Sequence, residues 1–159
     1  MDTEQVGQKQ PPLLSEIGLD NFTPYLMNRI MGRYNASLRA EMAKLGITTA
    51  QMRVLAVLSV HNGILIRDLA VYAQVEQSTL SRALDTLEKQ KLIRRKADKQ
   101  DSRATRIILS AAGGKAFARL WPHISVFYQQ MFAGIAPQEQ TAFIGTLQKM
   151  LANVRIHKI

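Results

Sequence analysis

The chain has 159 residues, enough for one domain with additional helices, and it has no cysteine, which excludes disulfides, thiolate metal sites and thiol redox switches. Its content of 47% hydrophobic and 21% charged residues is that of a globular protein, and its apolar runs fall short of the roughly 18 residues that a membrane span needs. The net charge of +9 favours a polyanionic partner, either nucleic acid or an anionic membrane surface.

Residues 1–20 are predicted to be a flexible tail. They contain the pair Pro11-Pro12 and four acidic residues, and they lack the basic stretch followed by an apolar segment that marks a secretory signal. The expected location is therefore cytoplasmic.

Two helices are predicted next. Apolar residues recur at spacings of three and four from Phe22 to Leu45, which predicts a long amphipathic helix over residues 21–46 that ends at Gly46. Thr48 and Gln51 form the pattern of a capping box, which predicts the start of a second helix. Asn62-Gly63 then gives a turn signal.

A helix-turn-helix is predicted after residues 64–66, a short apolar stretch that could pair as a strand. Helical patterns over 67–73 and 76–91 are separated by only two or three residues. In the second of these helices Leu80, Ala83, Leu84 and Leu87 fall on one side, as in a buried stripe. The other side begins with small hydroxyls and Arg82, a surface that can approach base edges in a major groove.

A β-hairpin with a charged tip is predicted over residues 92–109. Residues 91–106 carry seven basic and two acidic side chains, so the excess charge is concentrated there. A membrane-surface helix would set its basic residues opposite a continuous apolar face, which this segment lacks. The hairpin therefore favours DNA, lying along the backbone with an arginine in the minor groove. A flexible charged run is the alternative, which the flanking strand-forming residues disfavour.

Two more helices complete the chain. Ser110 is a candidate cap for the first, although Gly113-Gly114 should weaken its first turns and Pro122 should kink it. Pro137 is expected to open the last helix.

Several of these segments resemble the MarR family of winged helix-turn-helix transcriptional regulators. Residues 101–113, DSRATRIILSAAG, are similar to the family's wing signature D-x-R-x-x-x-(aliphatic)-x-L-(S/T)-x-x-G. Upstream, Asp68-Leu-Ala, Ser78-Thr-Leu-Ser-Arg82 and Leu87-Glu-Lys match its helix-turn-helix. The order of elements also agrees, so the resemblance covers about residues 22–157.

The resemblance implies a mainly α fold with a small β-wing. A winged helix-turn-helix domain at 47–110 would be flanked by dimerisation helices at 21–46 and 111–159. The expected function is a homodimeric regulator, a repressor, on a pseudo-palindromic double-stranded DNA operator with half-site centres about 10 base pairs apart.

The same comparison implies the DNA-contacting residues. Ser78, Thr79, Ser81 and Arg82 are expected in the recognition helix. Lys99 and Arg103 are the wing contacts that the resemblance implies, and Asp101 is expected to orient an arginine rather than to meet anionic DNA. The sequence itself adds Arg94, Arg95 and Lys96, the basic residues along the first strand of the predicted wing.

Three departures from the family pattern matter. Leu65 stands where a hydroxyl cap is usual, and Lys91 stands where glycine usually follows the recognition helix, so that helix end is expected to close differently. The absence of cysteine excludes the thiol-based peroxide sensors of the family.

A small aromatic or phenolic effector is a further expectation from the family. Tyr34, Met52, His61, Trp121 and Met131 are candidates for its pocket, although such residues are more often plain core. No cofactor or metal is expected, and an enzyme is disfavoured because His61, His123 and His157 are scattered. The alternative function is a ligand-independent or non-specific, architectural DNA-binding protein.

Overall fold

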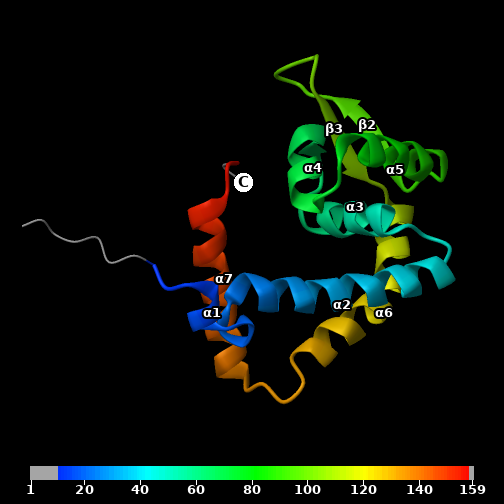
Figure 1. Ribbon diagram of the computed structural model, residues 1–159. Coiled ribbons are helices and arrows are strands. Elements are labelled where there is room, and N and C mark those ends of the chain that lie inside the picture. Colours follow the sequence, from blue (N-terminus) through cyan, green and yellow to red (C-terminus); the bar gives the residue numbers. More distant parts are fainter. Residues whose placement is uncertain (1–10, 158–159) are drawn as a thin grey trace, which may run out of the picture. The chain divides into compact units, whose positions relative to one another are not determined.

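The computed structural model describes residues 11–157 and is mainly helical, with one small antiparallel sheet (Figure 1). Two compact units, one up to Ala36 and one from Ser37, are each described by themselves. The helices are α1 (Leu14–Ile17), the 3-10 helix η1 (Leu19–Asn21), α2 (Thr23–Lys44), α3 (Thr49–Val60), α4 (Ile66–Ala73), α5 (Gln77–Lys89), α6 (Ala111–Met131) and α7 (Pro137–Val154). The strands are β1 (Ile64–Leu65), β2 (Ile93–Ala97) and β3 (Thr105–Leu109).

Part of the segment predicted as a flexible tail is helical in the structure. Residues 14–21 form α1 and η1, whereas residues 1–10 lie outside the described part of the chain. The backbone N–H of Leu13 donates to Glu16 Oε2 at 2.9 Å, and Gly18 adopts a φ of +75° that turns the chain between the two helices. Glu16, one of the four acidic residues of this segment, thus closes a helical turn.

The predicted capping box begins α3. The N–H of Gln51 donates to Thr48 Oγ1 at 3.1 Å, and the N–H of Thr48 donates to Gln51 Oε1 at 2.9 Å. These two bonds satisfy amides that a helix start otherwise leaves without partners. They confirm the predicted boundary.

The helix-turn-helix consists of α4 and α5. Gln74 ends α4 in the left-handed region, with φ +50°, and its carbonyl accepts a bond of 3.3 Å from Arg53 Nη1 of α3. Leu65 supplies no side-chain cap to α4, as the sequence predicted. The turn therefore depends on α3 for part of its hydrogen bonding.

The predicted hairpin is confirmed and carries one additional strand. The order in the sheet is β1-β3-β2, with Ile107 of β3 opposite both Ile64 and Arg95. Ile93 and Ile107 are fully buried against leucines of α3, α4 and α5 (Leu55, Leu58, Leu69, Leu80, Leu84 and Leu87). Figure 1 shows the loop of the hairpin projecting beyond the helices that cover the sheet.

The end of α5 closes through a left-handed lysine. Lys91 has φ +60°, its N–H donates to the carbonyl of Glu88 at 2.8 Å, and the N–H of Leu92 donates to Leu87 at 2.9 Å. This is the geometry that glycine usually provides after a helix. The expectation that the end would close differently is therefore wrong, because Lys91 itself adopts the strained conformation.

Replacing Lys91 with glycine is expected to raise the free energy of unfolding by about 1 kcal/mol, because glycine removes the steric cost of a left-handed side chain. Lys89→Gly is the matched control, since Lys89 lies two residues earlier within α5. It should lower stability by roughly 0.5–1 kcal/mol. Urea unfolding measures both, and equal destabilisation by the two changes would contradict the account.

The start of α6 packs closely against the backbone that enters the wing. Ser110 caps α6 by accepting the N–H of Gly113 at 3.0 Å, as predicted, and α6 continues through Pro122. A Cβ added to Gly113 would lie 2.1 Å from the carbonyl oxygen of Leu92, so close packing, not helix propensity, explains this glycine. No helix within residues 11–157 is long and apolar enough to span a membrane.

Candidate nucleic-acid interface

Helix α5 is divided into a buried face and an exposed face. The predicted buried stripe of Leu80, Ala83, Leu84 and Leu87 is in the core. On the other side Ser78, Ser81 and Arg82 are exposed, and Thr79 is half-buried at the edge. The solvent-facing start of α5 therefore carries short hydroxyls and one long cation, which a major groove can accommodate.

The wing presents basic side chains to solvent. Arg94, Lys96, Lys99 and Arg103 are all exposed. Asp101 Oδ1 accepts the backbone N–H of Arg103 at 3.0 Å. Asp101 therefore holds the backbone at the tip of the wing through this bond, and its expected role in orienting an arginine side chain stays a prediction.

Asp98 fixes the turn of the wing, a role that the sequence analysis missed. One carboxylate oxygen of Asp98 accepts the N–H groups of Gln100 and Asp101, both at 3.1 Å, and the other binds the guanidinium of Arg106. Arg106 Nη1 also donates to the carbonyl of Gly63 at 2.8 Å. The signal was the Asp followed by polar residues, which is typical of an Asx turn.

The contact with Arg106, and then the two backbone bonds, hold the pKa of Asp98 below its ordinary value of 3.8. The depressed pKa means that Asp98 stabilises the fold above about pH 4 and that this contribution is lost as the pH falls through the lower native pKa. We expect Asp98→Asn to remove it, so that the variant loses less stability than the wild type between pH 4 and pH 2. The free energy of unfolding of both proteins, measured across that pH range, checks this. Equal losses of stability in the variant and the wild type between pH 4 and pH 2 would contradict it.

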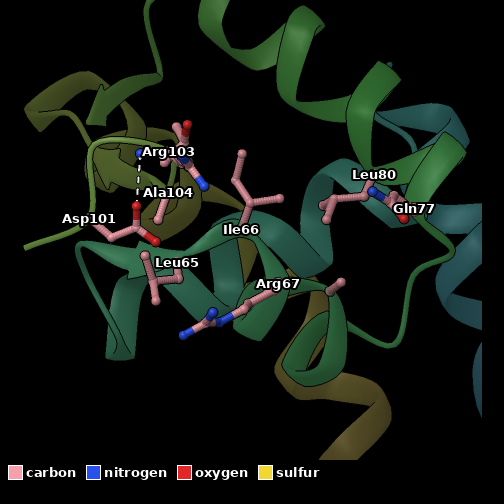
Figure 2. A pocket seen from close by; sticks show the side chains of 10 residues that line it. Leu65, Ile66, Arg67, Gln77, Leu80, Asp101, Arg103 and Ala104 are labelled. Atoms are coloured by element: carbon pink, nitrogen blue, oxygen red, sulfur yellow. Dashed lines mark hydrogen bonds between the residues drawn. The ribbon is translucent and has the colours of Figure 1, made fainter. Parts of the chain in front are cut away.

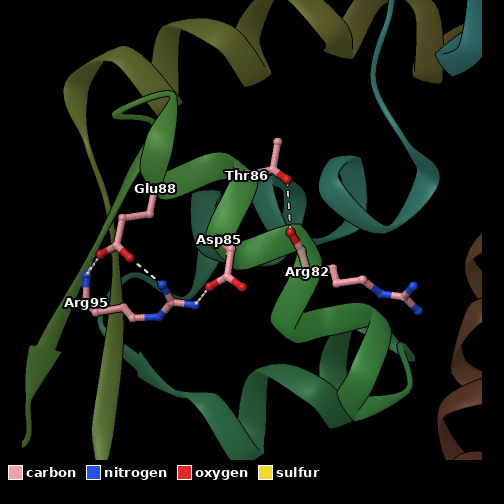
Figure 3. A network of polar contacts seen from close by, with 5 residues as sticks. All are labelled: Arg82, Asp85, Thr86, Glu88 and Arg95. Carbon is pink, nitrogen blue, oxygen red and sulfur yellow. Dashed lines mark hydrogen bonds and ion pairs between the residues drawn. The ribbon is translucent and has the colours of Figure 1, made fainter.

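Arg95 differs from the four exposed basic residues of the wing. Its Nη2 lies 2.7 Å from Asp85 Oδ1, its Nη1 binds Glu88, and its backbone N–H donates to Glu88 Oε1 at 3.1 Å (Figure 3). The side chain is 29% exposed. The guanidinium of Arg95 is therefore directed to α5, and the direct contact with DNA that the sequence suggested for it stays a prediction.

A cavity of about 520 Å³ lies between the wing tip and the two helices of the helix-turn-helix (Figure 2). Leu65, Ile66, Ala70 and Leu80 make its apolar part. The polar lining consists of Arg67, Gln77, Asp101, Arg103 and Thr105, with Ala104 beside them.

The five residues predicted for an effector pocket do not line this cavity. Met52 is buried in the core, the His61 ring stacks 4.7 Å from that of Tyr72, and Trp121 is 52% exposed with its ring 6.2 Å from Phe117. Met131 is half-buried at the end of α6, and Tyr34 belongs to the other unit. Aromatic and methionine residues at helical spacing identify apolar faces, but they do not show which faces enclose a space.

The scattered histidines form no site within the described residues. His123 Nδ1 of α6 lies 3.0 Å from Glu41 Oε1 near the end of α2. This bond, and then the one from Lys44, lower the pKa of Glu41. Among residues 11–157 no three histidine or acidic side chains gather as metal ligands.

Comparison with known proteins identifies the family. The model of the MarR family matches residues 45–104. A MarR family transcriptional regulator from Silicibacter pomeroyi, a solved structure, is 55% identical, covers 93% of this chain and 100% of its own, and superposes with a TM-score of 0.88. The chain belongs to the MarR family. It is therefore a DNA-binding transcriptional regulator with a winged helix-turn-helix.

The chain is also similar to a second solved structure and to a curated repressor. MepR of S. aureus, solved in complex with DNA, is 27% identical, covers 84% of this chain and 98% of its own, and has a TM-score of 0.69. The HTH-type transcriptional repressor IacR of Pseudomonas putida is 21% identical over 124 residues, which are 78% of this chain and 74% of that protein.

Proposed function

We propose that this MarR family protein is a repressor that binds a pseudo-palindromic operator as a homodimer. Each copy would place the start of α5 in a major groove and the wing along the neighbouring backbone and minor groove. The observation that carries the proposal is the exposed hydroxyl-and-arginine face of α5 beside a projecting basic hairpin. The DNA-bound relative MepR supports the same use of the fold.

The proposed contacts divide into base reading and backbone binding. Ser78, Thr79, Ser81 and Arg82 supply the groups that can meet base edges, because they lie in the first turns of α5. The cations of the wing meet phosphates and the minor groove: Arg94, Lys96, Lys99 and Arg103. Arg95 leaves the set of direct contacts that the sequence predicted.

We propose that the exposed apolar side chains of α6 and α7 pack against a second copy of this chain. None of the residues of α7 is buried, although many of them are apolar: Phe143, Leu151 and Val154 are 45%, 61% and 75% exposed. Trp121 of α6 is exposed as well. Apolar side chains gathered along a helix in this way mark an association surface, and self-association with two-fold symmetry suits a palindromic site.

Release by a small aromatic or phenolic compound is a separate proposal. The cavity between Leu65, Ile66 and Leu80 has apolar walls, with Arg67 and Arg103 available to an anionic group. A ligand there would contact the wing and both helices of the helix-turn-helix, α4 and α5. It could therefore favour an arrangement of these elements that fits the operator less well. The effector would then act on the angle of the wing.

Competition binding tests the proposal against non-specific DNA binding. The labelled duplex is the region upstream of the protein's own gene, and the competitor is random duplex of the same length. A repressor is expected to prefer its own region by at least about a thousandfold and to bind as two chains per site. Equal affinity for the two duplexes would instead support an architectural protein. Repeating the titration with aromatic acids tests release.

Base reading has its own variant. Arg82→Ala should change the preference at one position in each half-site by about 1–3 kcal/mol. Binding to a panel of single-base operator variants measures this, and a uniform loss across the panel would make Arg82 a backbone contact only.

A further inference from the structure

We propose that Arg95 is a positioning residue for DNA binding that holds the wing against the recognition helix and offsets two carboxylates which would otherwise repel DNA. The inference rests on the proposed function and concerns how its surface is assembled. It replaces the direct DNA contact that the sequence suggested for this arginine.

The first observation is the geometry of the three side chains. Asp85 and Glu88 lie one turn apart on α5, and Arg95 reaches them from β2 with separate nitrogens, 2.7 Å to Asp85 Oδ1 through Nη2 and to Glu88 through Nη1 (Figure 3). A planar guanidinium that donates to two carboxylates fixes direction as well as distance. The cluster therefore ties the first strand of the wing to the C-terminal half of the recognition helix.

The second observation is the edge of the sheet. Strand β2 is an outer strand, because the order is β1-β3-β2. Glu88 Oε1 accepts the backbone N–H of Arg95 at 3.1 Å, so the same carboxylate that binds the guanidinium also satisfies an amide on the strand's free edge. The strand is thus held to α5 through both its backbone and its side chain.

The third observation is the charge on the DNA-facing side. Asp85 lies on the exposed face of α5, one turn after Arg82, and its side chain is 65% exposed. A carboxylate at that place opposes the approach of phosphates. Burial alone would lower the pKa of Arg95, but the hydrogen bonds to Asp85 and Glu88 outweigh it and raise that pKa, so the arginine stays charged. With Arg95 the cluster carries a net charge of −1 instead of −2.

Arg82 shows that the two arginines have different tasks. Figure 3 shows its side chain extending away from the cluster, while Arg95 lies across the carboxylates. The Nε of Arg82 makes only a 3.4 Å contact, to the carbonyl of Ser78 within α5. Arg82 is therefore available to DNA, whereas Arg95 acts on DNA through the surface that it assembles.

A thermodynamic cycle tests the inference. Affinity for the operator duplex is measured for four proteins: the wild type, Arg95→Gln, Asp85→Asn with Glu88→Gln, and the combination of all three changes. We expect Arg95→Gln to weaken binding about tenfold. Removing the two carboxylates in the Arg95→Gln background should restore the part of that loss that comes from their repulsion of DNA, but not the part that comes from the lost contact between β2 and α5. With Arg95 present, the same removal breaks that contact and should give no gain.

Arg94→Gln provides the matched control, because Arg94 is the preceding residue of β2 and is exposed. It should reduce the salt dependence by about one phosphate contact. Removing the carboxylates of Asp85 and Glu88 should change the affinity for the operator no more in the Arg94→Gln protein than in the wild type. Melting curves and the hydrogen exchange of the Arg95 amide accompany each protein, and exchange should accelerate when Glu88→Ala removes its acceptor.

The outcomes separate the two proposals. A gain from the carboxylate changes that is equal with and without Arg95 would overturn the positioning role, since it would show independent charges. Slow exchange of the Arg95 amide in Glu88→Ala would overturn the strand contact. Absence of any preference for the operator in the wild type would overturn the proposed function itself, and the inference with it.

Discussion

Arg103→Ala is expected to weaken operator binding by about ten- to a hundredfold, the equivalent of roughly 1–3 kcal/mol, without changing folding or assembly. Arg103 is exposed at the tip of the wing, and its backbone N–H is held by Asp101 Oδ1 at 3.0 Å. This bond fixes the backbone from which the guanidinium extends. A cation inserted into a narrow minor groove gains from the negative potential concentrated there.

Lys115→Ala is the control for the loss of one positive charge. Lys115 is exposed in the first turns of α6, outside the wing and the recognition helix. It should cost little affinity at 150 mM salt, because exposed charges beyond about 8 Å are screened. Titrations with labelled operator, together with sedimentation of the free protein, compare the two variants. Undiminished binding by Arg103→Ala would remove the wing tip from the interface.

Gly113→Ala is expected to lower the free energy of unfolding by about 3 kcal/mol. The added Cβ would lie 2.1 Å from Leu92 O and 2.7 Å from Leu109 Cδ1. The leucine carbonyl cannot retreat freely, because it accepts the N–H of Ser110 at 3.0 Å and the hydroxyl of Ser110 at 2.9 Å. The start of α6 would have to move away from the base of the wing.

Gly114→Ala is the neighbouring control. Apart from its chain neighbours and the backbone of α6 itself, no atom of the described residues lies within 4 Å of the Cβ that would be added there, so alanine meets open space. Its better helix propensity should stabilise the protein by roughly 0.5–1 kcal/mol. Thermal or urea unfolding of both variants measures the contrast. Similar stabilities for the two would show that the junction between α6 and β2 is looser than described.

The periodic elements could be predicted from the sequence because local patterns determine them. The stripe of Leu80, Leu84 and Leu87 predicted a buried face of α5, and Thr48 with Gln51 predicted the start of α3, both as observed. Ser110 was likewise identified as the cap of α6. Hydrophobic spacing and capping depend on neighbours within a few residues, so a single sequence contains them.

Contacts between distant residues could not be predicted in the same way. Arg95 was grouped with the DNA-contacting cations because the sequence shows its charge but not the carboxylates on α5 that it binds. Lys91 was expected to require another helix end, although a lysine can adopt a left-handed φ when the hydrogen bonds around it hold it there. The effector candidates were chosen by residue type and do not line the cavity beside the wing, so their role stays a prediction.

Selection of bound sequences from random duplex DNA tests the central claim most directly. The full chain is mixed with a pool of random duplexes, and the retained molecules are sequenced after several rounds at about 150 mM salt, where backbone binding alone is weak. The account predicts an enriched inverted repeat whose half-site centres lie about 10 base pairs apart. Retention of duplexes with no enriched sequence would contradict it, because the face formed by Ser78, Ser81 and Arg82 would then read no bases.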